Sequence, residues 1–315
     1  MDNNSSKFAK LKWIAPLCTL IVLMIIGISA YIRLSGNGLG CSPWPNCFGE
    51  ILQTTPQSIK HSTELKTSAP IVFARGSHRI LAVVLLPLLL LLIFIEFNRK
   101  PKNIKSRWLS GLAVLLVIFL AVLGRWTSGK LMPAITLGNL IAGFLLLSLC
   151  WRLSQITFNK SRDLPLSHAG YIFKILTFTL LVLDIALGGL VSSNFIGLSC
   201  PSLIDCLCQP LTNWNNLNIF QQPFIDPQVV PKDQNGITTY SLHLYFSIGV
   251  AIGILGLSIH FFLHNRKRIG IFLLAFICIE FLLGFLINRN ELPLLLTVLH
   301  NLIAAILLAV LVSIG

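Results

Sequence analysis

Three histidines lie inside long apolar stretches of the sequence, each near one end of its stretch: His78, His243 and His300. A fourth apolar stretch carries Asn139 at the corresponding depth, roughly 6–12 Å from the end of the predicted helix. An ionisable side chain inside a membrane is costly and usually faces the interior of a helix bundle. Imidazoles that face each other across a bundle can act as axial ligands of haem iron. A histidine that only hydrogen-bonds to a neighbouring helix is the alternative, but the recurrence at one depth favours a haem site.

Zinc fits this pattern less well, because no carboxylate or thiol lies on the same apolar stretches at that depth. The remaining histidines lie in connecting segments or at the opposite end of a stretch, and we expect them to be solvated or interfacial: His61, His168, His260 and His264. The predicted iron ligands are therefore His78, His243 and His300, and Asn139 takes the position of a fourth.

The elements that must position these side chains are membrane-spanning helices. Hydrophobic residues make up 55% of the 315 residues and charged residues make up 11%, about half of the usual charged share in globular proteins. An apolar run of about 20 residues can cross the hydrocarbon core of a bilayer. The sequence therefore predicts an all-α integral membrane protein with eight spans, at residues 11–33, 70–96, 108–127, 132–151, 171–194, 239–263, 269–288 and 292–312. The first span is longer than the apolar core of a signal peptide, about 7–15 residues, so we expect it to be retained.

The net charge of +13 does not indicate a nucleic-acid-binding protein, because the basic residues do not form one face. They lie in short connectors after the second, fourth and sixth spans, which is the positive-inside pattern of membrane proteins. These connectors should face the cytoplasm, or the matrix of a mitochondrion. Both termini should lie on the same inner side, and a bacterial plasma membrane is the location that we favour.

Two halves of the chain, residues 1–156 and 157–315, resemble each other. Each half consists of a span, a long outer loop and three more spans. The tetrapeptide Asn-Leu-Ile-Ala occurs in the fourth span of each half, at residues 139–142 and 301–304. Both halves run in the same direction, so the sequence predicts a repeat about an axis along the membrane normal. Two repeated four-helix bundles are the expected fold.

The long outer loops, residues 34–69 and 195–238, share a cysteine pattern. Each contains Gly-Leu, a small residue, Cys, five residues and a second Cys. An oxidising outer compartment permits disulfides. The second loop also contains Cys208 as an alternative partner, although the repeat favours the earlier cysteine. Each pair can form a structural disulfide that stabilises its loop, and the first pair is also a candidate redox-active dithiol. The predicted disulfides are Cys41 with Cys47 and Cys200 with Cys206.

Further motifs occur in a fixed order along the chain, close to the ends of the spans. They are Arg33 and Gly-Leu ahead of Cys-x-x-Trp-Pro-x-Cys, then His78-Arg79, then Gly-x-Trp-Thr at residues 124–127 ahead of Pro133, then Gly-Gly-x-Val-Ser at residues 188–192, and finally His243 and His300. The combination is more specific than any single motif. With it, the chain resembles the heme A synthase family over almost its whole length.

The resemblance implies an eight-helix protein with two related four-helix bundles. The second bundle would hold haem b as a prosthetic group, with His243 and His300 as axial iron ligands. The first bundle would bind haem O as substrate, with His78 as iron ligand beside Arg79. The family oxidises a methyl group of haem O to a formyl group and so makes haem A for terminal oxidases. The resemblance also implies contact with membrane lipid, with the farnesyltransferase that makes haem O, and with an electron donor such as a quinol or a ferredoxin.

The chain departs from the family pattern at three positions. Arg75 stands three residues before His78, where the family usually has Glu. Asn139, or Gly138 if the repeat sets the register, stands where the fourth span usually has His, and Leu244 stands where the family often has Arg. Asn is not a strong iron ligand, so haem O would be five-coordinate through His78. Loss of a catalytic carboxylate commonly lowers a rate by about 10²–10⁴-fold, although Arg75 can instead pair with a haem propionate.

These departures leave two alternatives to the enzyme open. One is a haem-binding carrier or oxidase-assembly protein of the same family that has lost the chemistry. The other is a small-molecule transporter, because repeated helices also suit transport. Against transport, Asp184 and Glu280 are the only acids deep in the spans, and no broken helix is evident. We expect an oxidoreductase, with His78 and Arg75 as candidate catalytic residues.

Overall fold

The structure, a computed structural model, describes residues 13–35, 69–99, 103–126, 132–158, 166–200, 202–221 and 236–314. Within these ranges it contains helices and no strands. Eight of the helices in these described ranges are long and apolar enough to cross a membrane. They are α2 (Ile14–Leu34), α4 (Ala69–Asn98), α5 (Ile104–Trp126), α6 (Pro133–Thr157), α7 (His168–Ser193), α9 (Ile237–Leu263), α10 (Lys267–Arg289) and α11 (Leu294–Ser313). The short helices α8 (Leu203–Cys208) and η3 (Asn215–Leu217) lie between α7 and α9.

The eight predicted spans and the all-α class are confirmed, and the largest difference in bounds is at the inner end of α6. This helix continues to Thr157, beyond the predicted end at residue 151. Its last turns are polar, but they are not a loop, because Arg152 is buried and donates a hydrogen bond to the carbonyl oxygen of Ser313 at 2.9 Å. The C-terminal end of α11 thus holds the polar end of α6 in place.

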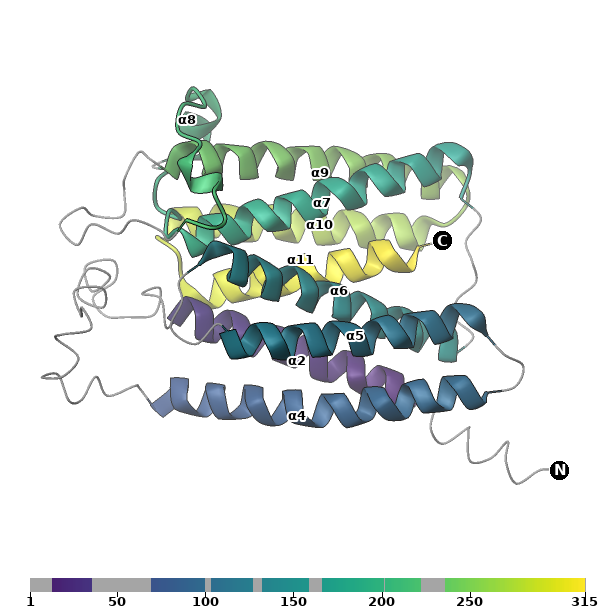
Figure 1. The fold of residues 1–315 in the computed structure, drawn as a ribbon. Coiled ribbons are helices and arrows are strands. Elements are labelled where there is room, and N and C mark those ends of the chain that lie inside the picture. The colour runs from purple at the N-terminus through teal and green to yellow at the C-terminus, as the bar shows by residue number, and fades with distance from the viewer. Residues whose placement is uncertain are drawn as a thin grey trace, which may run out of the picture.

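The helices pack in the same order in each half of the chain (Figure 1). In the first half, α2 and α5 each pack against α4 and α6. In the second half, α7 and α10 each pack against α9 and α11. The halves meet where α11 packs against α2 and α6, and where α6 packs against α7. Helices α6 and α11 therefore lie at the centre of the molecule.

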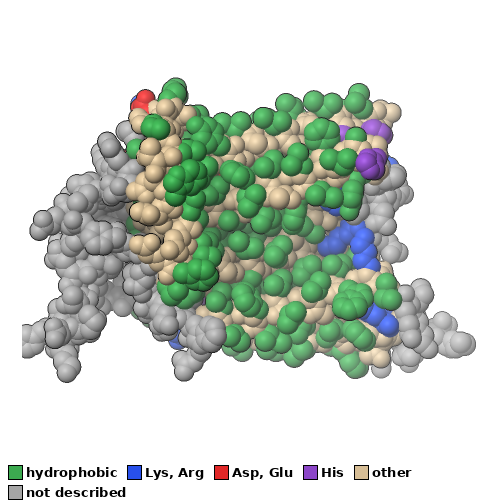
Figure 2. Space-filling view, turned by 45° about the horizontal axis from the view of Figure 1, so that its top comes forward, with side chains coloured by type: hydrophobic (Ala, Val, Ile, Leu, Met, Phe, Trp, Pro, Cys, Tyr) green, Lys and Arg blue, Asp and Glu red, His purple; other side chains and the backbone are tan. Residues whose placement is uncertain are grey.

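The outer surface of the bundle is apolar along the length of the helices. Figure 2 shows hydrophobic side chains over this face, whereas Lys, Arg and His side chains gather at one end. A membrane-spanning helix satisfies its backbone groups internally, so it can present such a surface to lipid. The protein is a multi-pass membrane protein.

The second outer loop closes over the ends of α9 and α10. A disulfide joins Cys200 to Cys206, as the repeat predicted, and Cys208 is free and exposed. Ser241 donates a hydrogen bond to the carbonyl oxygen of Cys206 at 2.7 Å, and Asn288 donates one to that of Cys200 at 3.1 Å. The first cysteine pair, Cys41 with Cys47, and also His61 lie outside the described residues, so those predictions stand untested.

Candidate functional site

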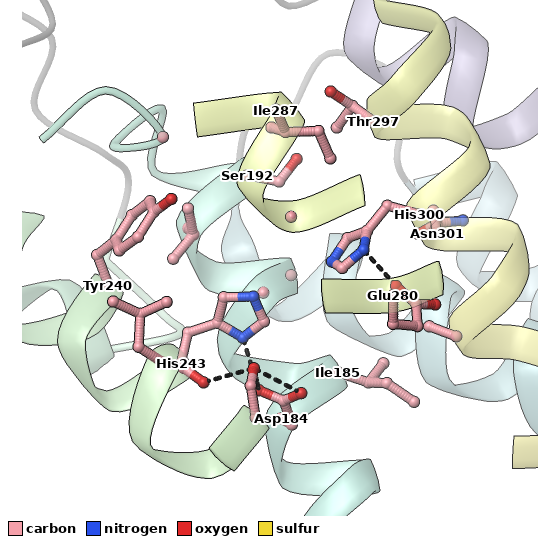
Figure 3. A pocket seen from close by; sticks show the side chains of 18 of the residues that line it. Asp184, Ile185, Ser192, Tyr240, His243, Glu280, Ile287, Thr297, His300 and Asn301 are labelled. Atoms are coloured by element: carbon pink, nitrogen blue, oxygen red, sulfur yellow. Dashed lines mark hydrogen bonds and ion pairs between the residues drawn. The ribbon is translucent and has the colours of Figure 1, made fainter. Parts of the chain in front are cut away.

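His243 and His300 line one cavity in the second half of the chain. Its volume is about 320 Å³, and its walls come mainly from α7, α9, α10 and α11. Each histidine is the seventh residue of its helix, counted from Ile237 in α9 and Leu294 in α11. The predicted common depth therefore places both imidazoles on one level, and Figure 3 shows them directed into the same space.

The imidazole of His243 is held from behind by a carboxylate of α7. The Nδ1 atom of His243 lies 2.7 Å from Oδ1 of Asp184. The hydroxyl of Ser247, one turn further along α9, lies 3.0 Å from the same carboxylate oxygen. A carboxylate at Nδ1 selects the tautomer that carries its proton there, so Nε2 is left as the free electron-pair donor. In Figure 3 the other ring nitrogen of His243 points into the cavity.

His300 has the same arrangement, with its partner on α10. Its Nδ1 atom contacts Oε2 of Glu280, whose side chain is only 9% exposed. Figure 3 shows each carboxylate behind its imidazole and the two rings directed toward the space between them. The site therefore contains two imidazole–carboxylate pairs, and the two members of each pair come from neighbouring helices.

The expectation that the helices carrying the histidines have no carboxylate at that depth holds, but it left out the neighbouring helices. It considered the helices that carry the histidines, whereas Asp184 and Glu280 come from the helices beside them. A strong polar group inside an apolar helix needs a partner, and both acids find theirs in an imidazole. These two residues are the functional candidates that sequence reasoning missed, although their depth in apolar spans was visible.

Glycines leave room for the rings. A Cβ atom at Gly188 would lie 3.1 Å from Cε1 of His243, and one at Gly284 would lie 4.0 Å from Cε1 of His300. The next residue, Gly189, faces the other half, where a Cβ atom would lie 2.7 Å from a methyl group of Leu137. The motif Gly-Gly-x-Val-Ser thus fits α7 between the imidazole of His243 and helix α6.

The candidate residues of the first half do not join this cavity. Arg75, His78 and Arg79 lie on α4; the two arginines are exposed and His78 is half-buried. Asn139 is the seventh residue of α6 and is also half-buried. None of the four lines the cavity that His243 and His300 share. The sequence of α4 contains one acid, Glu96 at its inner end, and those of α2, α5 and α6 contain none.

The model of the COX15-CtaA family, cytochrome oxidase assembly proteins, matches residues 12–312. The chain belongs to this family. A heme A synthase of Shewanella oneidensis is 30% identical over 323 residues, which covers 97% of this chain and 96% of that protein. A heme A synthase of Lysinibacillus sphaericus is 29% identical over 66% of each chain. The resemblance that the motifs indicated is confirmed, and the protein has a role in heme A biosynthesis for cytochrome oxidase.

One departure from the family pattern faces the cavity. Leu244, which follows His243 and was expected to depart from that pattern, lines the cavity with an apolar side chain. The other two departures, Arg75 and Asn139, lie in the first half. The cavity in the second half therefore contains both imidazoles and an apolar residue next to His243.

The remaining described histidines lie away from the site. His168 is the exposed first residue of α7, and His260 and His264 stack at the inner end of α9 with ring centroids 4.2 Å apart. These positions agree with the expectation of solvated or interfacial residues.

Proposed function

We propose that the protein oxidises a methyl group of haem O to a formyl group, and that its second half holds haem b between His243 and His300. The observation that carries the proposal is the pair of imidazoles on one cavity, each with a carboxylate at Nδ1. The match to a heme A synthase over 97% of the chain supports the reaction.

The residues around the cavity fit an iron porphyrin. Two imidazoles whose Nδ1 atoms face carboxylates and whose Nε2 atoms are free are a suitable axial ligand set, and most of the other lining side chains are apolar. Asp184 and Glu280 hold the rings in orientation and raise the basicity of the nitrogen that faces the cavity. When bound, the iron of haem b would supply one-electron transfer to the oxidation.

The first half is the proposed site of the substrate, haem O. We assign His78 as its iron ligand, with Arg79 and Arg75 nearby as partners for propionate groups. Asn139 cannot take the place of a second imidazole, so one axial position of haem O would stay free. Both arginines are exposed at the outer part of α4, where a charged group of the substrate can stay close to water.

The shared packing order supports a division into two related bundles, residues 1–156 and 157–315. In each, the first and third helices pack against the second and fourth. The basic connectors support an orientation with both termini in the cytoplasm of a bacterium. In this orientation the haem sites lie near the outer face. The farnesyltransferase that makes haem O and a quinol or ferredoxin donor are the partners that this reaction would need.

A pigment analysis tests the reaction. The protein would be expressed in a host that makes haem O but lacks its own heme A synthase, and extracted haems would be separated by chromatography. We expect haem A in these cells and none with a His243→Ala, His300→Ala variant. Bound haem without haem A would overturn the proposal in favour of a carrier. That outcome would be reinforced if haem A appeared only after Asn139→His together with Arg75→Glu.

A further inference from the structure

An arginine of the first half reaches the cavity of the second half. Arg33 lies in the last turn of α2 and lines the cavity that holds His243 and His300. Its Nη1 atom donates a hydrogen bond to Oγ of Ser192 at 3.2 Å, and its Nη2 atom donates one to Oδ1 of Asn301 at 3.3 Å. The guanidinium therefore lies between α7 and α11, next to the residue that follows His300.

The charge of Arg33 is not neutralised by the described part of the chain. Both of its hydrogen-bond partners are neutral, and the two acids that line the cavity contact the histidines instead. Among the described residues that line the cavity, Arg33 is the only Lys or Arg. A guanidinium has five N–H donors, and an unpaired cation in an apolar wall is costly. The arrangement calls for an anionic group on the ligand.

The position of Arg33 also defines where that anion would lie. Arg33 and Ser192 are in the outermost turns of α2 and α7, whereas Asp184 lies eight residues earlier in α7, about 12 Å further into the membrane. The cation thus lies beside His300 and on the outer side of the level at which Asp184 holds His243. A ligand that places its iron between the imidazoles would meet Arg33 with its outward edge.

We propose that Arg33 binds a propionate carboxylate of the porphyrin in the second half of the chain. A porphyrin of this class carries its two carboxylates on one edge, and that edge would face the aqueous side. Guanidinium and carboxylate form strong bidentate hydrogen bonds. The inference rests on the proposed haem site. Since Arg33 belongs to the first half, the haem site of the second half is completed by a side chain of the first.

A purely structural role is the competing explanation. Arg33 joins three helices, and a cation in the last turn of a helix also interacts favourably with the helix dipole. Such a role does not depend on the ligand's carboxylates. Esterification of the propionates therefore separates the two explanations, because it removes the negative charges and leaves the iron and the ring unchanged.

The experiment is a titration of the purified full chain, free of pigment, with ferric protoporphyrin IX and with its dimethyl ester. The bands of the bound porphyrin report binding. The variants are Arg33→Met, Arg33→Lys, which keeps the charge, and Arg289→Met. Arg289 is a matched control, because it is an exposed cation in the last turn of α10 and does not line the cavity. Thermal unfolding of each variant without porphyrin checks its folding.

We expect Arg33→Met to weaken binding of the diacid about 10- to 100-fold, the size of a hydrogen bond to a charged group, and to leave binding of the dimethyl ester unchanged. Arg33→Lys should lose less, and Arg289→Met nothing. Equal weakening of both porphyrins, or unchanged binding of the diacid, would overturn the role of Arg33. The spectrum of the unaltered protein tests the haem site independently of Arg33. A six-coordinate low-spin spectrum supports the haem site even if Arg33 has no effect on binding of the diacid.

Discussion

The Nδ1 atom of His243 lies 2.7 Å from Oδ1 of Asp184, and this contact joins α9 to α7 at the wall of the cavity. His300 and Glu280 make the corresponding contact between α11 and α10. A ligating histidine commonly donates its second N–H to a carboxylate, which fixes the orientation of the ring. The site is therefore built from two helix pairs, each of which supplies an imidazole and its acid.

Removing either acid should weaken haem binding. We expect Asp184→Asn and Glu280→Gln to lower the affinity for haem b about 10- to 100-fold, because the imidazole loses its fixed orientation and part of its basicity. The measurement is a spectrophotometric titration of the haem-free protein. Asp205→Asn is the control, since Asp205 is exposed in α8 and pairs with Ser202. Unchanged affinity in both cavity variants would contradict the role of the carboxylates.

A methyl group at Gly188 should displace the ring of His243. A Cβ atom there would lie 3.1 Å from Cε1 of the imidazole, and overpacking costs about 1–3 kcal/mol. We expect Gly188→Ala to lower haem affinity about tenfold or more and to increase the high-spin fraction in the absorption spectrum. Gly249→Ala serves as the control, because its Cβ atom would lie 3.5 Å from a methyl group of Leu180, an ordinary contact. Identical spectra for the two variants would argue against close packing at Gly188.

The two halves should respond separately to loss of a histidine. His78→Ala should keep the low-spin spectrum of haem b, because His78 does not line the cavity of the second half. It should lower haem A formation about 10²-fold or more, as expected when a substrate is misplaced. Haem extraction after expression with a haem O source gives the yield. His168→Ala is the control at an exposed site. Normal haem A yield from His78→Ala would refute the substrate assignment.

The disulfide between Cys200 and Cys206 should stabilise the outer loop without creating the haem site. Loss of a disulfide that closes a short loop costs about 2–3 kcal/mol. We expect Cys200→Ser to unfold at a lower temperature but to keep its haem spectrum, because Asp184 still holds His243. Cys208→Ser should match the unaltered protein, since Cys208 is free. If only Cys208→Ser were destabilised, the pairing would be wrong.

The spans and the histidine pair could be predicted from the sequence for different reasons. The length of an apolar run alone decides whether a helix can cross a membrane, so all eight helices followed from composition. Common depth in related helices grouped His78, His243 and His300, and the resemblance to the family paired His243 with His300; of the three, these two line the shared cavity. The depth of a residue in the membrane depends only on its position along its own helix, and this position can be read from the sequence.

The partners of these histidines could not be predicted in the same way. Whether Asp184 faces His243 depends on the rotation of α7 against α9, and this is set by packing such as that of Gly188 and Gly189. The contacts of Arg33 with Ser192 and Asn301 were even less predictable from the sequence, because they depend on how the two halves of the chain pack against each other. The departures at Arg75 and Asn139 were visible in the sequence, but the cavity of the second half contains neither residue.

The most direct test is the absorption spectrum of the purified protein and of its histidine variants. The unaltered protein should contain haem b with a six-coordinate low-spin spectrum. His243→Ala and His300→Ala should each give a five-coordinate high-spin form, and the double variant should lose stoichiometric haem, whereas His260→Ala should change nothing. A colourless unaltered protein, or an unchanged Soret band in the double variant, would contradict haem ligation by these two residues.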